Sequence, residues 1–268
     1  MEGSTATPPS RGIFQSAEQE AEPANCGSYL KSMVRIGKIT QKAVIDLYSP
    51  PIIQKSWETV QGDIAELMED LELWASSLPV GLNFFHHTLD QVHRRERTIL
   101  EIYYYDTKIL ITRPCLHHID RDIERQTQDS HDFNQKTAAT CVASAKSITN
   151  VLPDNIFGDR MLLYQGPWWA IVHNIMRAVA VLLQEVFQEA NSLSHDKLDA
   201  VPSLKKLVRC LRVMKMNNCV ANRAYRIAME LLHKATPHVH MVGPHLCNLL
   251  AHAPVLFERD PKMQMLNL

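Results

Sequence analysis

The sequence predicts an all-α protein, a single domain of about seven helices with a disordered N-terminal tail. Only 9 glycines and 14 prolines interrupt its 268 residues, which favours long helices. Apolar residues recur at steps of three and four in several segments, the period of an amphipathic helix. No segment alternates between polar and apolar residues with the period of two that is typical of strands. A folded chain of this size buries about three quarters of its unfolded surface, so it needs no metal or disulfide for stability.

Three regions are predicted along the chain. Residues 1–27 are rich in Ser, Thr, Pro, Glu and Ala. They are predicted to be a disordered tail, because such a segment buries too little apolar surface to offset the entropy of ordering. Residues 28–235 form the helical domain. Residues 236–268 are rich in proline and histidine and are predicted to be a weakly ordered C-terminal tail.

The first two helices are indicated by apolar stripes and by the residues that end them. The first begins at Ser28 and ends at Pro50-Pro51, because proline disfavours helical geometry in the residue before it. The second covers residues 57–74 and ends in the Leu-Pro-Val-Gly sequence of residues 78–81. Its outer face is predicted to be acidic. The acidic residues are Glu58, Asp63, Glu66, Glu69, Asp70 and Glu72.

The middle of the chain predicts two further helices. The third carries apolar residues from Ile99 onward and is expected to end near Arg113-Pro114. A polar stretch at residues 119–127 is predicted to add one or two helical turns. The fourth helix covers residues 133–152 and is stopped by the proline that follows.

The last three helices include the most apolar one. Residues 168–187 are apolar on nearly all sides, so this helix is predicted to run through the core. Gly166-Pro167 precedes it, and proline suits the first helical position because its missing N–H would be unpaired there anyway. Residues 202–216 and 220–232 are predicted to form a closing helical pair. No stretch reaches 18 consecutive apolar residues, so no membrane-spanning helix is expected.

The six cysteines do not follow a metal-binding pattern. No C-x-x-C pair is present, and the shortest gap between two cysteines holds eight residues. Structural zinc sites place their ligand pairs two to four residues apart. We therefore expect reduced thiols that pack as small core residues, in a cytosolic or nuclear protein. The cysteines are Cys26, Cys115, Cys141, Cys210, Cys219 and Cys247.

No catalytic, cofactor-binding or metal-binding residue is predicted. The sequence lacks G-x-S-x-G, G-x-x-x-x-G-K-[ST] and G-x-G-x-x-G. The acidic string at residues 120–124 lacks the spacing of a magnesium-binding D-D-x-x-D motif. Two histidine groups lack a spacing of four on a helix and are expected to be solvated loop residues. They are His86, His87 and His93, and His238, His240 and His245.

The charge balance disfavours a dedicated nucleic-acid binder. The chain holds 28 Lys and Arg against 29 Asp and Glu, a net charge of -1. One basic stripe has two interpretations. It contacts an acidic partner or nucleic acid, or it is a solvated helix face that complements the acidic helix at residues 57–74. The stripe comprises Lys205, Lys206, Arg209, Arg212 and Lys215.

Five short motifs occur in a characteristic order. They are Tyr48-Ser49-Pro50 with Trp57, Trp74 to Pro79, the helix at residues 102–116 with Arg113-Pro114, Cys141 to Ala145, and Tyr164 to Trp169. Together they resemble the fungal-specific transcription factor domain, the regulatory middle region of fungal zinc binuclear cluster transcription factors. The resemblance covers residues 28–235 and implies packing roles without catalytic residues. Arg113-Pro114 would end a helix, and the tryptophan pair would anchor the core. The motif residues with these structural roles are Trp57, Trp74, Arg113, Pro114, Pro167, Trp168 and Trp169.

The resemblance implies transcription regulation in the nucleus, with the cytoplasm as the alternative, over a metabolic or biosynthetic gene set. The implied partners are the transcription machinery or other regulators, and no membrane. A small-molecule effector and a homodimer through residues 57–74 are further expectations. Zinc and DNA binding are expected only in a missing zinc cluster or a partner domain, because the six paired cysteines of that cluster are not in this sequence. The alternatives are an all-α small-molecule enzyme and a stand-alone helical interaction module.

Overall fold

The computed structural model describes residues 23–50, 55–85, 92–118, 127–154, 167–191, 200–216 and 218–235. Within these ranges the regular elements are seven α-helices and one 3-10 turn, which confirms the predicted fold class. They are α1 (Cys26–Tyr48), α2 (Trp57–Ser76), η2 (Val80–Leu82), α3 (Arg94–His118), α4 (Gln128–Val151), α6 (Trp168–Asn191), α7 (Ala200–Met214) and α8 (Cys219–Ala235). The expectations for residues 1–22, 119–126 and 236–268 lie outside the described residues, as do those for His86, His87 and Cys247.

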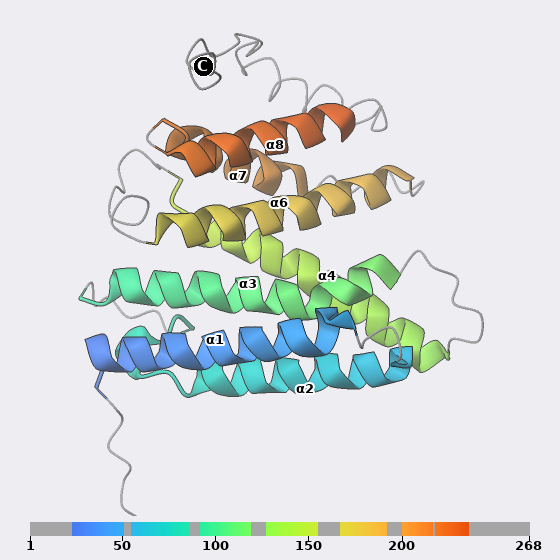
Figure 1. The fold of residues 1–268 in the computed structure, drawn as a ribbon, viewed down its shortest axis with the longest axis horizontal. Coiled ribbons are helices and arrows are strands. Elements are labelled where there is room, and N and C mark those ends of the chain that lie inside the picture. The colour runs from blue at the N-terminus through green and yellow to red at the C-terminus, as the bar shows by residue number, and fades with distance from the viewer. Residues whose placement is uncertain are drawn as a thin grey trace, which may run out of the picture.

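Helix α3 lies in the middle of the stack, between the α1–α2 pair and α6, with α7 and α8 beyond α6 (Figure 1). Two apolar cores meet on it. Leu100 and Ile111 belong to the core shared with α1 and α2. Ile102 and Ile109 belong to the larger core shared with α4, α6, α7 and α8. Helix α3 therefore contributes side chains to both cores.

Side-chain caps set where three of the helices begin. Asn25 accepts a hydrogen bond from the backbone N–H of Ser28 at 2.9 Å, and the Ser28 hydroxyl accepts one from the Asn25 N–H at 2.9 Å. This reciprocal capping box starts α1 at Cys26, two residues inside the stretch expected to be a tail. Ser56 and Thr127 cap α2 and α4 in the same general way.

The acidic outer face of α2 is present as predicted, but its partners are not in the basic stripe. Lys42 of α1 contacts Glu66 at 2.6 Å and Asp70 at 3.1 Å. Lys55, just before α2, contacts Asp63 at 2.6 Å. In the stripe, the only ion pair among the described residues joins Lys206 to Asp154 at 2.6 Å. The suggested complement between the stripe and α2 is therefore not supported.

Helix α6 runs through the core, as its composition predicts. Ile175, Ala178, Val179 and Leu182 are fully buried, and the helix packs against α3, α4, α7 and α8. The stretch Trp169–Phe187 is long and apolar enough to cross a membrane by length and composition, although it contains no run of 18 consecutive apolar residues. Its place among four neighbouring helices accounts for that composition, because a helix buried on several sides needs apolar residues on each of them.

Candidate functional site along helix α3

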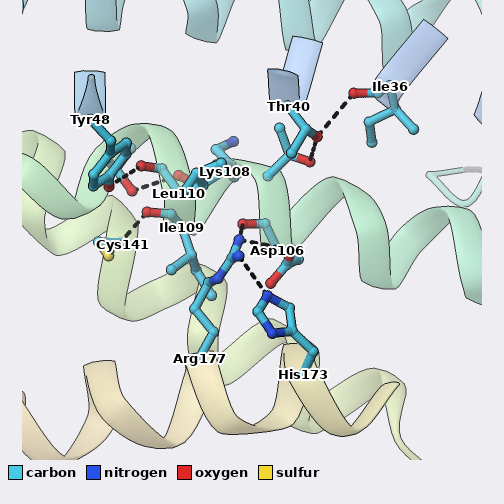
Figure 2. A network of polar contacts seen from close by, with 12 residues as sticks. Ile36, Thr40, Tyr48, Asp106, Lys108, Ile109, Leu110, Cys141, His173 and Arg177 are labelled. Atoms are coloured by element: carbon cyan, nitrogen blue, oxygen red, sulfur yellow. Dashed lines mark hydrogen bonds and ion pairs between the residues drawn. The ribbon is translucent and has the colours of Figure 1, made fainter. Parts of the chain in front are cut away.

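Helix α3 does not end at Arg113-Pro114; it continues to His118 with Pro114 inside it. Proline has no N–H, so the carbonyl of Leu110 loses its helical partner. The hydroxyl of Tyr48, the last residue of α1, donates to this carbonyl at 2.7 Å (Figure 2). Burial raises the pKa of Tyr48 to about 12, so the phenol keeps the proton that it donates. The expected helix end was wrong because the replacement donor lies on a different helix.

A double-mutant cycle tests this substitution of one donor for another. Tyr48→Phe should lower the free energy of unfolding by about 1 kcal/mol, because the Leu110 carbonyl loses its hydrogen bond. In a Pro114→Ala background the same change should cost clearly less, since the backbone N–H restored at position 114 can take that carbonyl. Urea unfolding followed by far-UV circular dichroism measures both. Equal losses in the two backgrounds would contradict the assignment.

A buried ion pair joins α3 to α6. Asp106 Oδ2 lies 2.9 Å from Arg177 Nη1, and the two side chains are 7% and 16% exposed. The other guanidinium nitrogen, Nη2, lies 2.7 Å from His173 Nε2 (Figure 2). Burial raises the pKa of Asp106, while Arg177 and then His173 oppose that rise. Asp106 Oδ1 has no hydrogen-bond partner among the described residues, so Arg177 is the main compensation for burying this carboxylate.

The next residue of α3 makes a polar joint with α1. Thr40 donates its hydroxyl proton to the carbonyl of Ile36 at 3.0 Å. Its oxygen lies 2.9 Å from the Thr107 hydroxyl, which then acts as the donor between the two side chains. Asp106 and Thr107 therefore hold α6 and α1 from adjacent positions on α3. Because buried polar groups must find specific partners, these two joints fix how both helices sit on α3.

The first predicted motif residue, Trp57, lies in a polar cluster between α2 and α4. Its indole Nε1 donates to Asn134 Oδ1 at 3.2 Å. The amide of buried Gln61 donates to the same oxygen at 2.8 Å and to the carbonyl of Ser130 at 2.9 Å. The hydroxyl of Ser130 donates a hydrogen bond to Gln61 Oε1 at 2.9 Å. This cluster orients α4 on α2, a role that the sequence motif did not indicate.

The second motif tryptophan, Trp74, is fully buried between α1, α2 and α3. It is 1% exposed, and its Nε1 donates to the carbonyl of Ser32 at 3.0 Å. Its ring stacks on Tyr104, with ring centres 6.4 Å apart and an interplanar angle of 17°. The Tyr104 hydroxyl donates in turn to Glu72 Oε1 at 2.7 Å. Trp74 therefore joins three helices by apolar packing and one directed hydrogen bond.

The tryptophan pair that opens α6 does not anchor the core as a pair. Trp169 is 60% exposed and shares its side of the helix with exposed His173. Most of the Trp169 side chain therefore faces solvent, and this residue does not anchor the core. The side chain of Trp168 lies outside the described residues. Pro167 comes just before α6, where its carbonyl accepts from the N–H groups of Ala170 and Ile171 at 2.9 and 3.1 Å.

The buried thiols are protonated side chains and do not have the character of nucleophiles or metal ligands. Burial raises the pKa of Cys141 to about 11 and those of Cys115 and Cys210 to about 12. Within the described ranges, no group of three or more His, Cys, Asp or Glu side chains is placed to hold a metal ion. Cys141 Sγ faces the carbonyl of Ile109 at 3.9 Å, a packing contact with α3 (Figure 2).

Glu101 on α3 predicts a pH dependence of stability. Burial raises its pKa to about 7, against the opposing charge of Arg97. The folded protein therefore holds this proton across the range in which the unfolded chain has released it. The free energy of unfolding should fall by about 1–3 kcal/mol as the pH rises from about 4.5 to 7. Glu101→Gln should flatten this slope in urea titrations, whereas Glu69→Gln on the exposed face of α2 should not. An unchanged slope in Glu101→Gln would contradict the assignment.

Two curated relatives show what the chain is similar to. Transcription regulator galc of Aspergillus niger is 26% identical over 243 residues, which cover 78% of this chain and 29% of that protein. Activator of stress genes 1 of Saccharomyces cerevisiae is 20% identical over 199 residues, which cover 73% of this chain and 20% of that protein. The chain resembles fungal transcription regulators. It spans less than a third of the length of both relatives. No protein-family model and no solved structure matches it.

Proposed function

We propose that this chain regulates transcription, as part of the helical regulatory region of a fungal zinc-cluster regulator in the nucleus. The similarity to two fungal regulators over about three quarters of the chain carries the proposal. DNA would be bound by a zinc cluster outside this chain or by a partner. The chain itself would act through protein contacts, with the transcription machinery or other regulators as partners.

Three polar contacts on α3 support a structural role for the groups that make them. Asp106 contacts Arg177 of α6, Thr107 contacts Thr40 of α1, and the carbonyl of Leu110 accepts from Tyr48 of α1. Each of these contacts fixes the packing of one helix on another.

A tethering experiment tests the proposal. The full chain is fused to a bacterial DNA-binding domain with a nuclear localisation signal. It is then recruited to two reporters in yeast, one with a minimal promoter and one with an active promoter. We expect reporter output to rise or fall relative to the DNA-binding domain alone. The variant Trp74→Ala, expected to disrupt the folded core, should abolish the effect.

Expression and location of the fusion are checked by immunoblotting and microscopy, so that a missing protein is not mistaken for an inactive one. Unchanged output at both promoters, with the fusion present in the nucleus, would overturn the proposal. Profiling of transcripts in a deletion strain provides the independent test. An unchanged transcriptome under growth and stress conditions would count against a regulatory role.

A further inference from the structure

The α7–α8 end of the molecule has a local excess of positive charge. Between residues 200 and 235 the sequence holds eight Lys and Arg residues and one acidic residue, although the whole chain has a net charge of -1. This end lies on the far side of α6 from α1 and α2 (Figure 1). The cations are Lys205, Lys206, Arg209, Arg212, Lys215, Arg223, Arg226 and Lys234, and the acid is Glu230.

Most of these cations are not neutralised within the described part of the chain. Lys206 pairs with Asp154 at 2.6 Å, and Lys234 lies 3.9 Å from Glu230. Lys215 lies over the ring of Tyr225, 4.4 Å from its centre. The other five make no ion pair with a described residue, and the four arginines among them are exposed. Those five are Lys205, Arg209, Arg212, Arg223 and Arg226.

Helix α8 also has an apolar stripe on its solvent side. Val220, Ile227 and Leu231 are 47%, 41% and 42% exposed, and their spacing of seven and four residues places them on one face. The opposite face is buried in the core through Ala221, Ala224, Tyr225, Ala228 and Leu232. Arg223 lies three residues after Val220 and four before Ile227, so a cation borders the exposed stripe. We call Val220, Arg223, Arg226, Ile227, Leu231 and Lys234 the α8 outer face.

We propose that the α8 outer face binds an acidic amphipathic helix of a partner protein, an inference that goes beyond the proposed function and does not depend on it. The apolar stripe has the spacing with which one helix packs on another. The surrounding cations complement carboxylates on the flanks of the partner helix, and the arginines of α7 add to the attraction at long range.

The chemistry of the face favours such a peptide over nucleic acid. The phosphates of a nucleic acid would form ion pairs with the cations but would leave the apolar stripe exposed to water. Single strands stack on exposed aromatic rings, and the aromatic residue of α8, Tyr225, is only 4% exposed. An acidic amphipathic helix uses both the charged and the apolar side chains of the face. Its binding should therefore depend on salt and on apolar contact together.

Fluorescence anisotropy with the full chain provides the test. The probe is a labelled synthetic helical peptide with leucines on one face and glutamates on both flanks. One control peptide replaces every glutamate with glutamine, and a second scrambles the order of the same residues. A labelled DNA duplex is the nucleic-acid probe. We expect the acidic amphipathic peptide to bind about tenfold or more tightly than either control peptide, and more weakly at higher salt.

Matched variants locate the binding on α8. Arg223→Glu with Arg226→Glu should weaken peptide binding about tenfold or more, and Ile227→Ser with Leu231→Ser should also weaken it. The control is Lys38→Glu with Lys136→Glu, which makes the same charge change at exposed positions on α1 and α4. It should leave binding nearly unchanged. Thermal melts followed by circular dichroism show whether each variant remains folded.

Four outcomes would overturn the proposal. The native chain fails to bind the acidic peptide, as it would if another segment of the same chain covered the face. The control pair weakens binding as much as the α8 pairs, which would show only non-specific attraction. The duplex binds more tightly than the peptide and depends on the same arginines, which would assign the face to nucleic acid. Light scattering shows self-association that Ile227→Ser with Leu231→Ser removes, which would assign it to a second copy.

Discussion

Replacing Arg177 with methionine should lower the free energy of unfolding by about 3–5 kcal/mol, because it leaves the Asp106 carboxylate buried without its charge partner. Urea unfolding at neutral pH measures the loss. Arg209→Met, at an exposed position on α7, is the matched control and should cost little. The loss in Arg177→Met should shrink as the pH falls, since a protonated Asp106 is buried as a neutral acid.

A second substitution separates a lost ion pair from lost packing. Adding Asp106→Leu to Arg177→Met removes the unpaired charge and should recover much of the stability, because apolar residues of similar size often replace a buried ion pair without net cost. Two results would contradict the role given to this pair. In the first, Arg177→Met lowers the free energy of unfolding no more than Arg209→Met does. In the second, Asp106→Leu with Arg177→Met is as unstable as Arg177→Met alone.

Replacing Trp74 with alanine should also cost about 3–5 kcal/mol, because it empties a fully buried site between three helices. Trp169→Ala removes the same side chain from a position that is 60% exposed and should cost about 1 kcal/mol or less. Far-UV circular dichroism during urea unfolding measures both without relying on tryptophan fluorescence. Similar costs at the two positions would contradict the assignment of Trp74 to the core.

Trp74→Phe isolates the hydrogen bond within this contact. Phenylalanine keeps an aromatic ring for Tyr104 but cannot donate to the carbonyl of Ser32. Trp74→Phe should therefore lower the free energy of unfolding, but by less than Trp74→Ala does. A loss as large as that of Trp74→Ala would show that the directed bond matters more than the apolar volume.

The predictions that succeeded depend on information local to one helix. The acidic face of α2 and the burial of α6 follow from the order of residues along a single element, because an amphipathic pattern is set by helical geometry. The predictions that failed depend on other elements. Pro114 sits inside α3 because Tyr48, on another helix, supplies a donor to Leu110. The exposure of Trp169 depends on which side of α6 faces the core.

One signal in the sequence pointed toward the joint between α3 and α6. Arg177 interrupts an otherwise apolar stretch, and a cation in such a helix needs a partner because burying an unpaired charge is costly. The pattern could not name that partner, since Asp106 lies 71 residues earlier on a different helix. The basic stripe was visible in α7, but the exposed arginines and apolar stripe of α8 became one surface only when its buried face was known.

Periodicity, helix ends and motif order are properties of the linear chain, and they predicted the fold class, the main helices and the resemblance to fungal regulators. The packing of the helices was needed to show that α3 is the central helix, which polar groups join it to α1 and α6, and which face of α8 is left to solvent. Burial decides those features, and it depends on which helices pack together, since the same side chain is a core residue or a surface residue according to what covers it.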